Sequence, residues 1–476
     1  MKEQEKDVRV HIVHLREELL LSEHQLFYRI YHALPLKRTG REVSEKNVSS
    51  KTENTLASLL AYKTKLENLK KSPFIFIVHT INLVHTLLFV IPHHLALEKI
   101  KREFLAHKLK QQSLPDIINF GVIPYNFRKL RQQHLAEELA KKGHRIFYIE
   151  NQFTTPEKYY PGYFVTQKYK NVFIIKLYSQ RDVAIYHQIP TKKEITSMYA
   201  SLKKLMHDTF IKNYVVKIDH PFWTYLLDHL SSPVIYDCMD DYAGFEITGK
   251  HIGKLEKKLV KKCDLTLVCS DLLLEKIVKF KPKKTLILKN ACEYDHFSIA
   301  SRPATSDRKT IGFFGALGEW VDDKLIALIA KKYPHASIVL IGEVQNVAIT
   351  RCAARYKNIV LLGEKPYDSL PHYLRTFDVC IIPFKVNSHT TLIDPVKLYE
   401  YFASGRAVVS TAIEEIKRFE GPLYYSHSPA DFIENIKKAL SENSKNLKAQ
   451  RQKIAYENTW ERRAEILHEE IQKISK

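Results

Sequence analysis

The sequence predicts an α/β protein with two successive units, each a parallel sheet covered by helices. From residue 116 onward, short runs rich in β-branched residues alternate with amphipathic stretches. A second, more regular alternation begins at Lys309. Two such arrays in one chain predict two Rossmann-like domains, joined by a hinge over residues 286–304.

The domain boundaries follow from where this alternation starts and stops. Residues 1–115 lack it and are predicted to form a helical appendage with a polar linker at 41–54. The first Rossmann-like domain is expected over 116–290 and the second over 291–445. The charged run 446–476 is expected to be a helix that packs back on the first domain.

The appendage contains an apolar run, FIFIVHTINLVHTLLFVI at residues 74–91, near the lower length limit of a bilayer span. Two histidines and an asparagine within it make a lipid-facing span costly. Basic residues flank the run on both sides. Three interpretations stay open: a membrane-surface segment within residues 72–102, a buried or interface helix, and a true span.

The bulk composition narrows the class of partner. The chain has 476 residues and a formal net charge of +21, which favours nucleic acid, an anionic membrane face or phosphorylated substrates. The sequence carries no zinc-finger or RNA-binding aromatic signature, so we expect no nucleic-acid partner. Six cysteines without a Cys-x-x-Cys pair and an N-terminus without a secretory signal predict a cytoplasmic protein. It could bind peripherally at the inner face of the plasma membrane.

The first unit opens with a strand at 117–123, a helix at 128–142 and a second strand at 145–149. Gly143 stands where a left-handed helix cap belongs. Further strands are expected at 171–177, 214–218, 234–237 and 265–269.

Polar residues follow two of these strands. Ligands of open parallel sheets bind at the carboxyl ends of the strands. His220 comes after the strand at 214–218, and the pair Asp240 and Asp241 comes after the strand at 234–237. A helix cap on a loop is an equally good interpretation of the aspartates taken alone.

The second unit repeats the alternation with clearer spacing. Its expected strands lie at 311–314, 337–341, 359–362, 379–383 and 407–410. Its expected helices lie at 322–332, 347–356, 369–377 and 395–404.

Two features of the second unit suit a nucleoside diphosphate. Gly312, Gly315 and Gly318 crowd the first strand-to-helix turn, and the following helix N-terminus can offer N–H groups to phosphate. Lys397 and Glu400 lie three residues apart on one helix, where they could neutralise phosphate and bind a ribose diol. An ordinary surface ion pair, worth about 0.3 kcal/mol, is the alternative for that pair.

Six segments occur in an order that resembles the retaining GT-B glycosyltransferases that build bacterial surface polysaccharides, including teichuronic acid enzymes. The resemblance runs from about residue 116 to the end. It implies two Rossmann-like domains facing across a cleft. The segments are SPVIYDCMDDYAGF, CDLTLVCSDLL, LKNACEYDHF, IGFFGALGEWVDDKLI, FDVCIIPF and DPVKLYEYFASGRAVVST.

The resemblance implies roles for individual positions. Glu400 would bind the donor ribose, and Lys397 with the backbone near Leu398 would face the diphosphate. The residues implied to bind the donor are Gly315, Leu317, Gly318, Asn290, Lys324, Pro383, Lys397, Leu398 and Glu400. The residues predicted to act in catalysis are His220, Asp240, Lys397 and Asp394. The residues expected near the acceptor are Arg128, Arg131, Gln132 and His134.

The chain departs from the family pattern at two places. Leu392 stands where relatives often carry a second glutamate, which leaves His389 and Asp394 as the nearby polar side chains. The Arg-and-Lys pair after the first strand of the second unit is also missing, and Lys324 is the only cation close by. The sugar contact and the stereochemical outcome therefore stay open.

The predicted function is transfer of a sugar from a nucleoside-diphosphate sugar to a glycan or lipid-linked acceptor, with retention as the expected outcome. No metal or other cofactor is expected, because the sequence has no Asp-x-Asp motif at a strand end. The alternatives are a GT-B-fold nucleotide-sugar epimerase and a non-catalytic, membrane-associated scaffold.

Overall fold

The computed structural model describes residues 95–100, 102, 114–155, 162–244, 248–301, 308–388 and 390–475. The predicted linker, the apolar run at 74–91 and His389 lie outside these residues. Within the predicted membrane-surface segment, Ala96 and Ile100 are described, and both are buried in a hydrophobic cluster of the first domain. None of the helices in the described ranges is long and apolar enough to cross a membrane.

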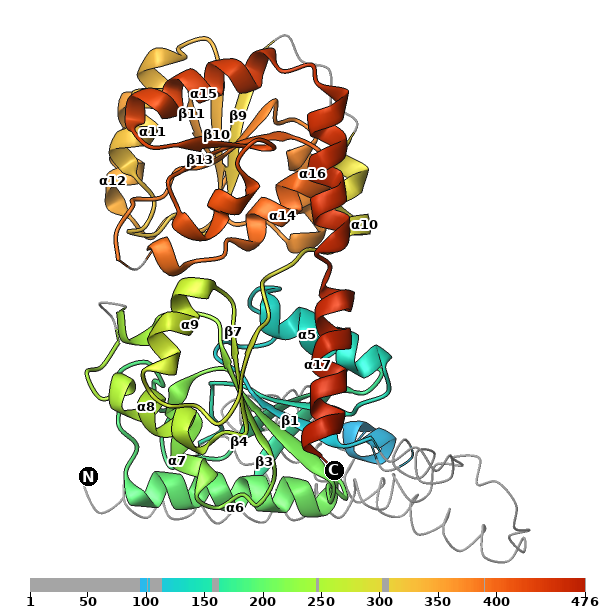
Figure 1. Cartoon of the computed structure of the whole chain (residues 1–476). Helices are drawn as coiled ribbons and strands as arrows, with labels where there is room; N and C mark the ends of the chain where they lie inside the picture. The colour runs from blue at the N-terminus through green and yellow to red at the C-terminus, as the bar shows by residue number, and fades with distance from the viewer. Residues whose placement is uncertain are drawn as a thin grey trace, which may run out of the picture. The chain divides into compact units, whose positions relative to one another are not determined.

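The first domain is built on one twisted sheet with strand order β3-β4-β2-β1-β5-β6-β7-β8 (Figure 1). All neighbouring strands are parallel except β3 and β4, which are antiparallel. The central strands are buried because helices cover both faces of a parallel sheet. The strands are β1 (Asp116–Phe120), β2 (Ile146–Ile149), β3 (Tyr163–Tyr169), β4 (Val172–Leu177), β5 (Tyr214–Ile218), β6 (Val234–Cys238), β7 (Leu265–Val268) and β8 (Thr285–Ile287).

Capping residues mark the ends of the helices of this domain. After α5, Gly143 has φ of +105°, which confirms the predicted left-handed cap. Helix α6 begins with a capping box between Thr191 and Glu194. The helices are α5 (Arg131–Lys141), α6 (Lys192–Asp208), α7 (Thr224–Leu227), α8 (Ile252–Lys262) and α9 (Asp271–Val278).

The second domain is a fully parallel sheet with strand order β11-β10-β9-β12-β13-β14. Its core is almost wholly apolar, as expected for strands that are buried on both faces. The strands are β9 (Thr310–Phe314), β10 (Ser337–Ile341), β11 (Ile359–Leu361), β12 (Val379–Ile382), β13 (Ala407–Thr411) and β14 (Leu423–Ser426). The helices are α10 (Tyr294–Ser298), α11 (Asp323–Lys332), α12 (Val347–Arg355), α13 (Leu370–Leu374), α14 (Val396–Ala403) and α15 (Pro429–Ser441).

The C-terminal segment, predicted as one helix, is two helices: α16 (Lys445–Glu457) and α17 (Trp460–Ile474). The break falls at Thr459, whose side chain caps α17. Helix α16 packs on α14 of the second domain, and α17 packs on α5 of the first. Because of this break, one amphipathic segment packs on both the first and the second domain.

Candidate functional site

The loop after β9 is shaped by two glycines that allow close backbone approach. Gly315 has φ of +133°, and a Cβ placed there would lie 2.9 Å from the Lys397 Cε atom. Gly342, after the neighbouring β10, has φ of +145°, and its Cβ would lie 2.1 Å from the Gly315 carbonyl oxygen. Any side chain at either position would therefore displace the loop or the lysine. The glycine predicted at 315 serves to admit Lys397.

Several other predicted donor-loop groups already have partners within the chain. The Leu317 N–H donates to the Glu343 carbonyl at 2.9 Å, and the Gly315 N–H donates to the Ile341 carbonyl at 2.8 Å. Gly318 is needed for a different reason, because a Cβ there would meet the Trp320 ring at 2.4 Å. The Pro383 carbonyl accepts the Asp322 N–H at 2.8 Å.

The helix after the glycine loop differs from the expectation of a free phosphate-binding N-terminus. The Asp322 side chain accepts a hydrogen bond from the Leu325 N–H and so caps α11. A second carboxylate, Asp323, lies in its first turn. A capped, acidic helix start disfavours an anion. Lys324 on this helix is exposed.

Helix α14 carries Lys397 and Glu400, the two residues predicted to bind the diphosphate and the ribose of the donor. The Lys397 Nζ atom lies 4.8 Å from the centroid of the Phe384 ring and 5.3 Å from that of Phe313. Within the described part of the chain, no carboxylate comes within 4 Å of this ammonium group. No side chain caps the start of α14, although the Leu398 N–H already donates to the Pro395 carbonyl. Lys397 is thus held by aromatic rings rather than by a counter-charge.

Burial shifts the pKa values of Lys397 and Glu400 in the directions that favour their neutral forms. Burial lowers the pKa of Lys397 to about 8, although the nearby Glu400 carboxylate opposes the change. Burial also raises the pKa of Glu400 to about 8, against the effect of Lys397. Among the described residues Glu400 makes no ion pair. A phosphate beside the lysine and hydroxyl groups beside the glutamate would supply the missing partners.

His220 lies at the carboxyl end of β5 in the first domain and is fully buried. Its Nδ1 atom accepts a hydrogen bond from the Phe222 N–H at 3.2 Å, which places the ring proton on Nε2. Burial lowers the pKa of His220 to about 3, so the ring is neutral at pH 7. Its ring contacts Tyr186 and Tyr242, and its Nε2 atom has no partner among the described residues. His220 therefore offers one unused hydrogen-bond donor.

The two neighbouring aspartates after β6 separate into different roles. Asp241 forms an ion pair with Lys276 and accepts a hydrogen bond from the Gly244 N–H at 3.2 Å, so it stabilises the local turn. Burial, with the Asp241 charge as a second cause, raises the pKa of Asp240 to about 7. Asp240 forms no ion pair within the described residues. Near neutral pH it can therefore hold or release a proton.

Three of the four residues expected near the acceptor are buried, and their place near an acceptor stays a prediction. Arg131 pairs with Asp237 at 2.9 Å and donates to the Leu288 carbonyl at 2.8 Å. His134 stacks on Trp460 with ring centroids 5.0 Å apart, and Gln132 is fully buried. The Arg131 contacts support the fold of the first domain, whereas the His134 ring also lies 5.5 Å from the Tyr367 ring of the second domain.

Arg128, the fourth, joins the carboxyl edges of the two sheets. Its guanidinium bonds Glu364 at 2.5 Å and Glu343 at 2.7 Å. Neither glutamate is among the site residues predicted from the sequence. A signal for them exists, because each follows a glycine at the end of a strand, in Ile341-Gly342-Glu343 and Leu362-Gly363-Glu364.

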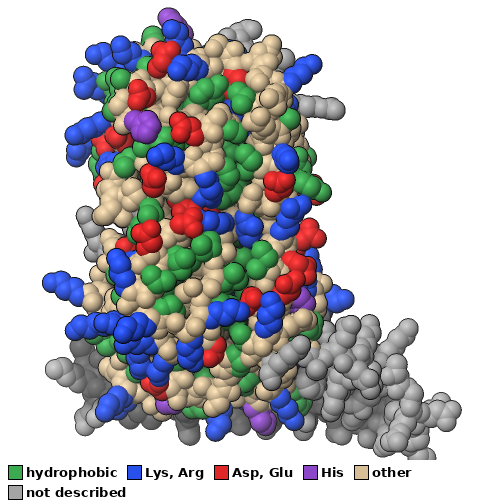
Figure 2. Space-filling model, in the orientation of Figure 1, with side chains coloured by type: hydrophobic (Ala, Val, Ile, Leu, Met, Phe, Trp, Pro, Cys, Tyr) green, Lys and Arg blue, Asp and Glu red, His purple; other side chains and the backbone are tan. Residues whose placement is uncertain are grey.

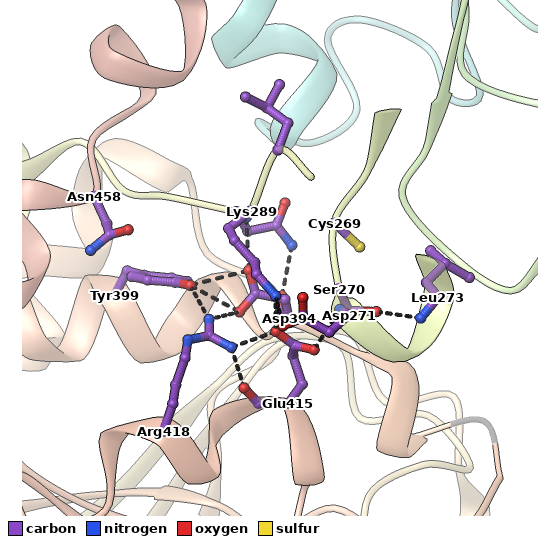
Figure 3. Close-up of polar contacts among 12 residues, drawn as sticks. Cys269, Ser270, Asp271, Leu273, Lys289, Asp394, Tyr399, Glu415, Arg418 and Asn458 are labelled. Atoms are coloured by element: carbon purple, nitrogen blue, oxygen red, sulfur yellow. Dashed lines mark hydrogen bonds and ion pairs between the residues drawn. The ribbon is translucent and has the colours of Figure 1, made fainter. Parts of the chain in front are cut away.

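Asn290, in the segment that connects the domains, contacts Asp394, which belongs to the cluster drawn in Figure 3. The Asn290 N–H donates to the Asp394 carboxylate at 2.7 Å, and its side-chain amide donates to the Asp394 carbonyl at 2.6 Å. The Tyr399 hydroxyl donates to the same carboxylate at 2.9 Å, and Arg418 reaches it at 3.3 Å. These contacts give Asp394 a structural role at the hinge, and its predicted catalytic role stays a prediction.

The same cluster contains a further bridge between the domains. Lys289 forms ion pairs with Asp271 of the first domain and Glu415 of the second (Figure 3). The Asp271 N–H also donates to Glu415 at 2.9 Å. Leu392, at the departure from the family pattern, lies in a short 3₁₀ turn nearby.

Comparison with known families finds a similarity in the second domain. A family model described as "Glycosyl transferases group 1" matches residues 308–442, which span β9 to β14 and α15. Residues 308–442 are thus similar to group 1 glycosyltransferases. Lys397, Glu400 and the Gly315 loop all lie within the matched residues.

A relative covers more of the chain. TuaH of Bacillus subtilis, named as a teichuronic acid biosynthesis glycosyltransferase, is 28% identical over 253 residues. The match covers 48% of this chain and 64% of TuaH, which is less than two thirds of that protein.

Solved structures establish the fold. Sucrose-phosphate synthase from Thermosynechococcus elongatus is similar with a TM-score of 0.61 at 14% identity, covering 75% of this chain and 98% of that one. HepE from Anabaena, solved in complex with UDP and glucose, has a TM-score of 0.54 at 12% identity and covers 75% and 99% of the two chains. The chain thus has the predicted GT-B fold, and the residues matched by the group 1 family model form its second Rossmann-like domain.

Proposed function

We propose that this protein transfers a sugar from a nucleoside-diphosphate sugar to a hydroxyl group of a glycan or lipid-linked acceptor in surface polysaccharide synthesis. One observation carries the proposal. Lys397 and Glu400 lie on one helix at the carboxyl edge of the second sheet, both desolvated and both without an ionic partner in the described residues. A nucleotide offers the two chemical groups that this pair lacks. The group 1 family match supports the same reaction class.

In the proposed reaction, the bond between the anomeric carbon and the diphosphate oxygen breaks while a bond to the acceptor oxygen forms. Negative charge gathers on the leaving diphosphate, and the Lys397 ammonium would stabilise it. A preorganised donor of this kind typically lowers a barrier by about 3 kcal/mol. The acceptor proton passes to the leaving phosphate, so atoms and charge balance. Same-face attack with retention is the outcome that the family resemblance favours.

The first domain would contribute the acceptor side. The neutral His220 would donate from Nε2 to a sugar hydroxyl once the side chains that cover it, Tyr186 and Tyr242 among them, move aside. Asp240, with a pKa of about 7, can accept a proton or a hydrogen bond from a hydroxyl group. Both residues follow adjacent parallel strands, β5 and β6, so they reach the same edge of the sheet. The prediction that no metal takes part remains part of this proposal.

The first test is titration calorimetry of the full chain with UDP-, GDP- and dTDP-sugars. UDP-sugars have priority because HepE was solved with UDP and glucose. We expect one nucleotide to bind and Glu400→Gln to weaken it at least tenfold. Glu414→Gln, a mostly exposed carboxylate on the same domain, is the matched control and should bind as the unmodified chain does.

A turnover assay then identifies the reaction. Release of the nucleoside diphosphate that depends on an added acceptor would support transfer. Isomerisation of the sugar without an acceptor would support the epimerase instead. A folded protein that binds none of the three nucleotide classes would overturn the proposal.

A further inference from the structure

The first domain carries a surface dominated by lysine, formed by α8 and the end of α9. Residues 250–289 contain twelve lysines, four carboxylates and no arginine. Seven of these lysines are exposed on the two helices and the turn that follows them, and we call them the lysine face. They are Lys254, Lys257, Lys258, Lys261, Lys262, Lys279 and Lys281.

The geometry of α8 turns its five lysines to one side. At about 100° per residue, positions 254, 257, 258, 261 and 262 fall within an arc of about 140°. The opposite side of the helix is buried, through Ile252, Glu256, Leu259 and Val260. The only carboxylate within α8 therefore points into the domain, where Tyr236 donates to it at 2.8 Å.

Most of this positive charge has no ionic partner among the residues that the structure describes. Asp228 pairs with Lys258 and Lys262. From the described residues, no carboxylate lies within 4 Å of the remaining members of the lysine face. Figure 2 shows Lys and Arg side chains gathered where Figure 1 places α8 and α9. The free members are Lys254, Lys257, Lys261, Lys279 and Lys281.

Exposed apolar side chains accompany the lysines. Val278, at the end of α9, is 47% exposed beside Lys279. Ile189 is 58% exposed, and its loop lies beside the start of α8 because the Gly249 N–H donates to the Tyr186 carbonyl at 2.9 Å. Lysines combined with single apolar residues suit a lipid headgroup region, where the apolar tips can enter the interface.

The same composition is a poor match to nucleic acid. Arginine forks and stacking aromatic rings are the usual contacts to bases and phosphates. The stretch 250–289 contains no arginine, tyrosine or tryptophan. Lysine instead acts as a flexible point charge, which is sufficient for a mobile layer of anionic headgroups.

We propose that the lysine face docks this protein on an anionic lipid bilayer. The inference concerns a surface of the first domain outside the candidate site, and it does not depend on the transfer reaction. It also differs from the membrane contact predicted within residues 72–102. Each lysine near an anionic surface contributes about 1 kcal/mol, or about fivefold in partition, so three of them account for about 100-fold.

The test is co-sedimentation of the full chain with vesicles of phosphatidylcholine alone or with about one third phosphatidylglycerol. The test variant is Lys254→Gln/Lys257→Gln/Lys261→Gln, which removes three exposed charges without disturbing the core. The matched control is Lys331→Gln/Lys332→Gln/Lys437→Gln on α11 and α15, which loses the same charge from exposed sites of the other domain. Any membrane contact by residues 72–102 is common to all three proteins and cancels in the ratio.

We expect the test variant to bind the anionic vesicles about 100-fold more weakly, and the control within about twofold of the unmodified chain. Binding should also fall steeply with added salt and be absent for the neutral vesicles. Equal losses in the two variants, or no loss in either, would overturn the proposal. A test variant that still binds vesicles but loses affinity for poly(U) RNA would overturn it in favour of a nucleic-acid surface.

Discussion

A buried charge cluster at the carboxyl edge of the first sheet is fully paired, whereas, among the described residues, Lys397 and Glu400 at the carboxyl edge of the second sheet are not. In the first domain, Arg131, Lys217, Asp219 and Asp237 are all buried and all paired, with Lys217 reaching Asp237 at 2.9 Å. Burial alone would raise the pKa of Asp237, but Arg131 and Lys217 outweigh it and lower the pKa to about 2. In the second domain, Lys397 and Glu400 are desolvated without such partners. Buried charge therefore marks a candidate site only where the chain leaves it unpaired.

The largest expected effect is on the paired side of this comparison. Lys217→Met removes the cation between two buried carboxylates, so we expect the free energy of unfolding to fall by about 3 to 5 kcal/mol. Urea denaturation measures the loss. Lys176→Met is the matched control, since Lys176 lies on β4 of the same sheet but is 34% exposed, and it should cost less than about 1 kcal/mol. Equal effects in the two variants would break the comparison.

For the unpaired Lys397, we expect a substitution to lower the activity without lowering the stability. Lys397→Met removes a desolvated charge, so the unfolding midpoint should stay or rise. The kcat/KM for the donor should fall about 100-fold, because the leaving diphosphate loses its cation. The control is Lys331→Met, an exposed lysine on α11. A large loss of stability in Lys397→Met would show that the lysine is structural.

The pH dependence of nucleotide binding sharpens the same contrast. The pKa of Lys397 is lowered to about 8 and that of Glu400 is raised to about 8, so rising pH removes a positive charge and adds a negative one. Affinity for a nucleoside diphosphate should be flat below pH 7 and fall about tenfold per pH unit above 8. Glu400→Gln removes the carboxylate that supports the ammonium group, so the fall should begin at lower pH. Affinity that rises between pH 8 and 9 would contradict the assignment.

The smallest expected effect concerns Asp240. Its pKa in the folded chain, about 7, lies above the ordinary value, so the folded state binds the extra proton and stability falls as pH rises from about 4 to 7. Asp240→Asn should remove this cost and stabilise the protein by about 1 kcal/mol at pH 8, with no gain at pH 4. Thermal unfolding at the two pH values measures the difference. Asp368→Asn, at an exposed carboxylate, should show no such dependence.

Much of the second domain could be predicted from the sequence. The expected strand at 337–341 coincides with β10, and the expected helix at 395–404 differs from α14 by one residue at each end. Apolar runs between glycines have few alternatives to a buried parallel strand. Three strands were missed: β3, β8 and β14. Strands β3 and β8 are edge strands with partly exposed or polar residues, which give no clear apolar pattern.

The candidate site was harder to predict than the fold. Arg131 and Arg128 stand three residues apart, yet Arg131 is buried against Asp237, which is 106 residues away, and Arg128 reaches across to Glu364, 236 residues away. Local spacing carries no information on such distant partners. The same holds for Leu317, whose N–H is used by the segment after β10.

The sequence by itself determined the two α/β arrays, the glycine-lined loop after β9 and the Lys397 and Glu400 pair on one helix, because these depend on local periodicity and spacing. Only the tertiary structure decided which charged residues have an ionic or hydrogen-bonding partner. Pairing between charges joins residues far apart in the chain, as when Asn290 binds Asp394 and Lys289 bridges Asp271 and Glu415. Burial then sets the energy of every charge that the fold leaves unpaired, and that energy distinguishes Lys397 from Lys217.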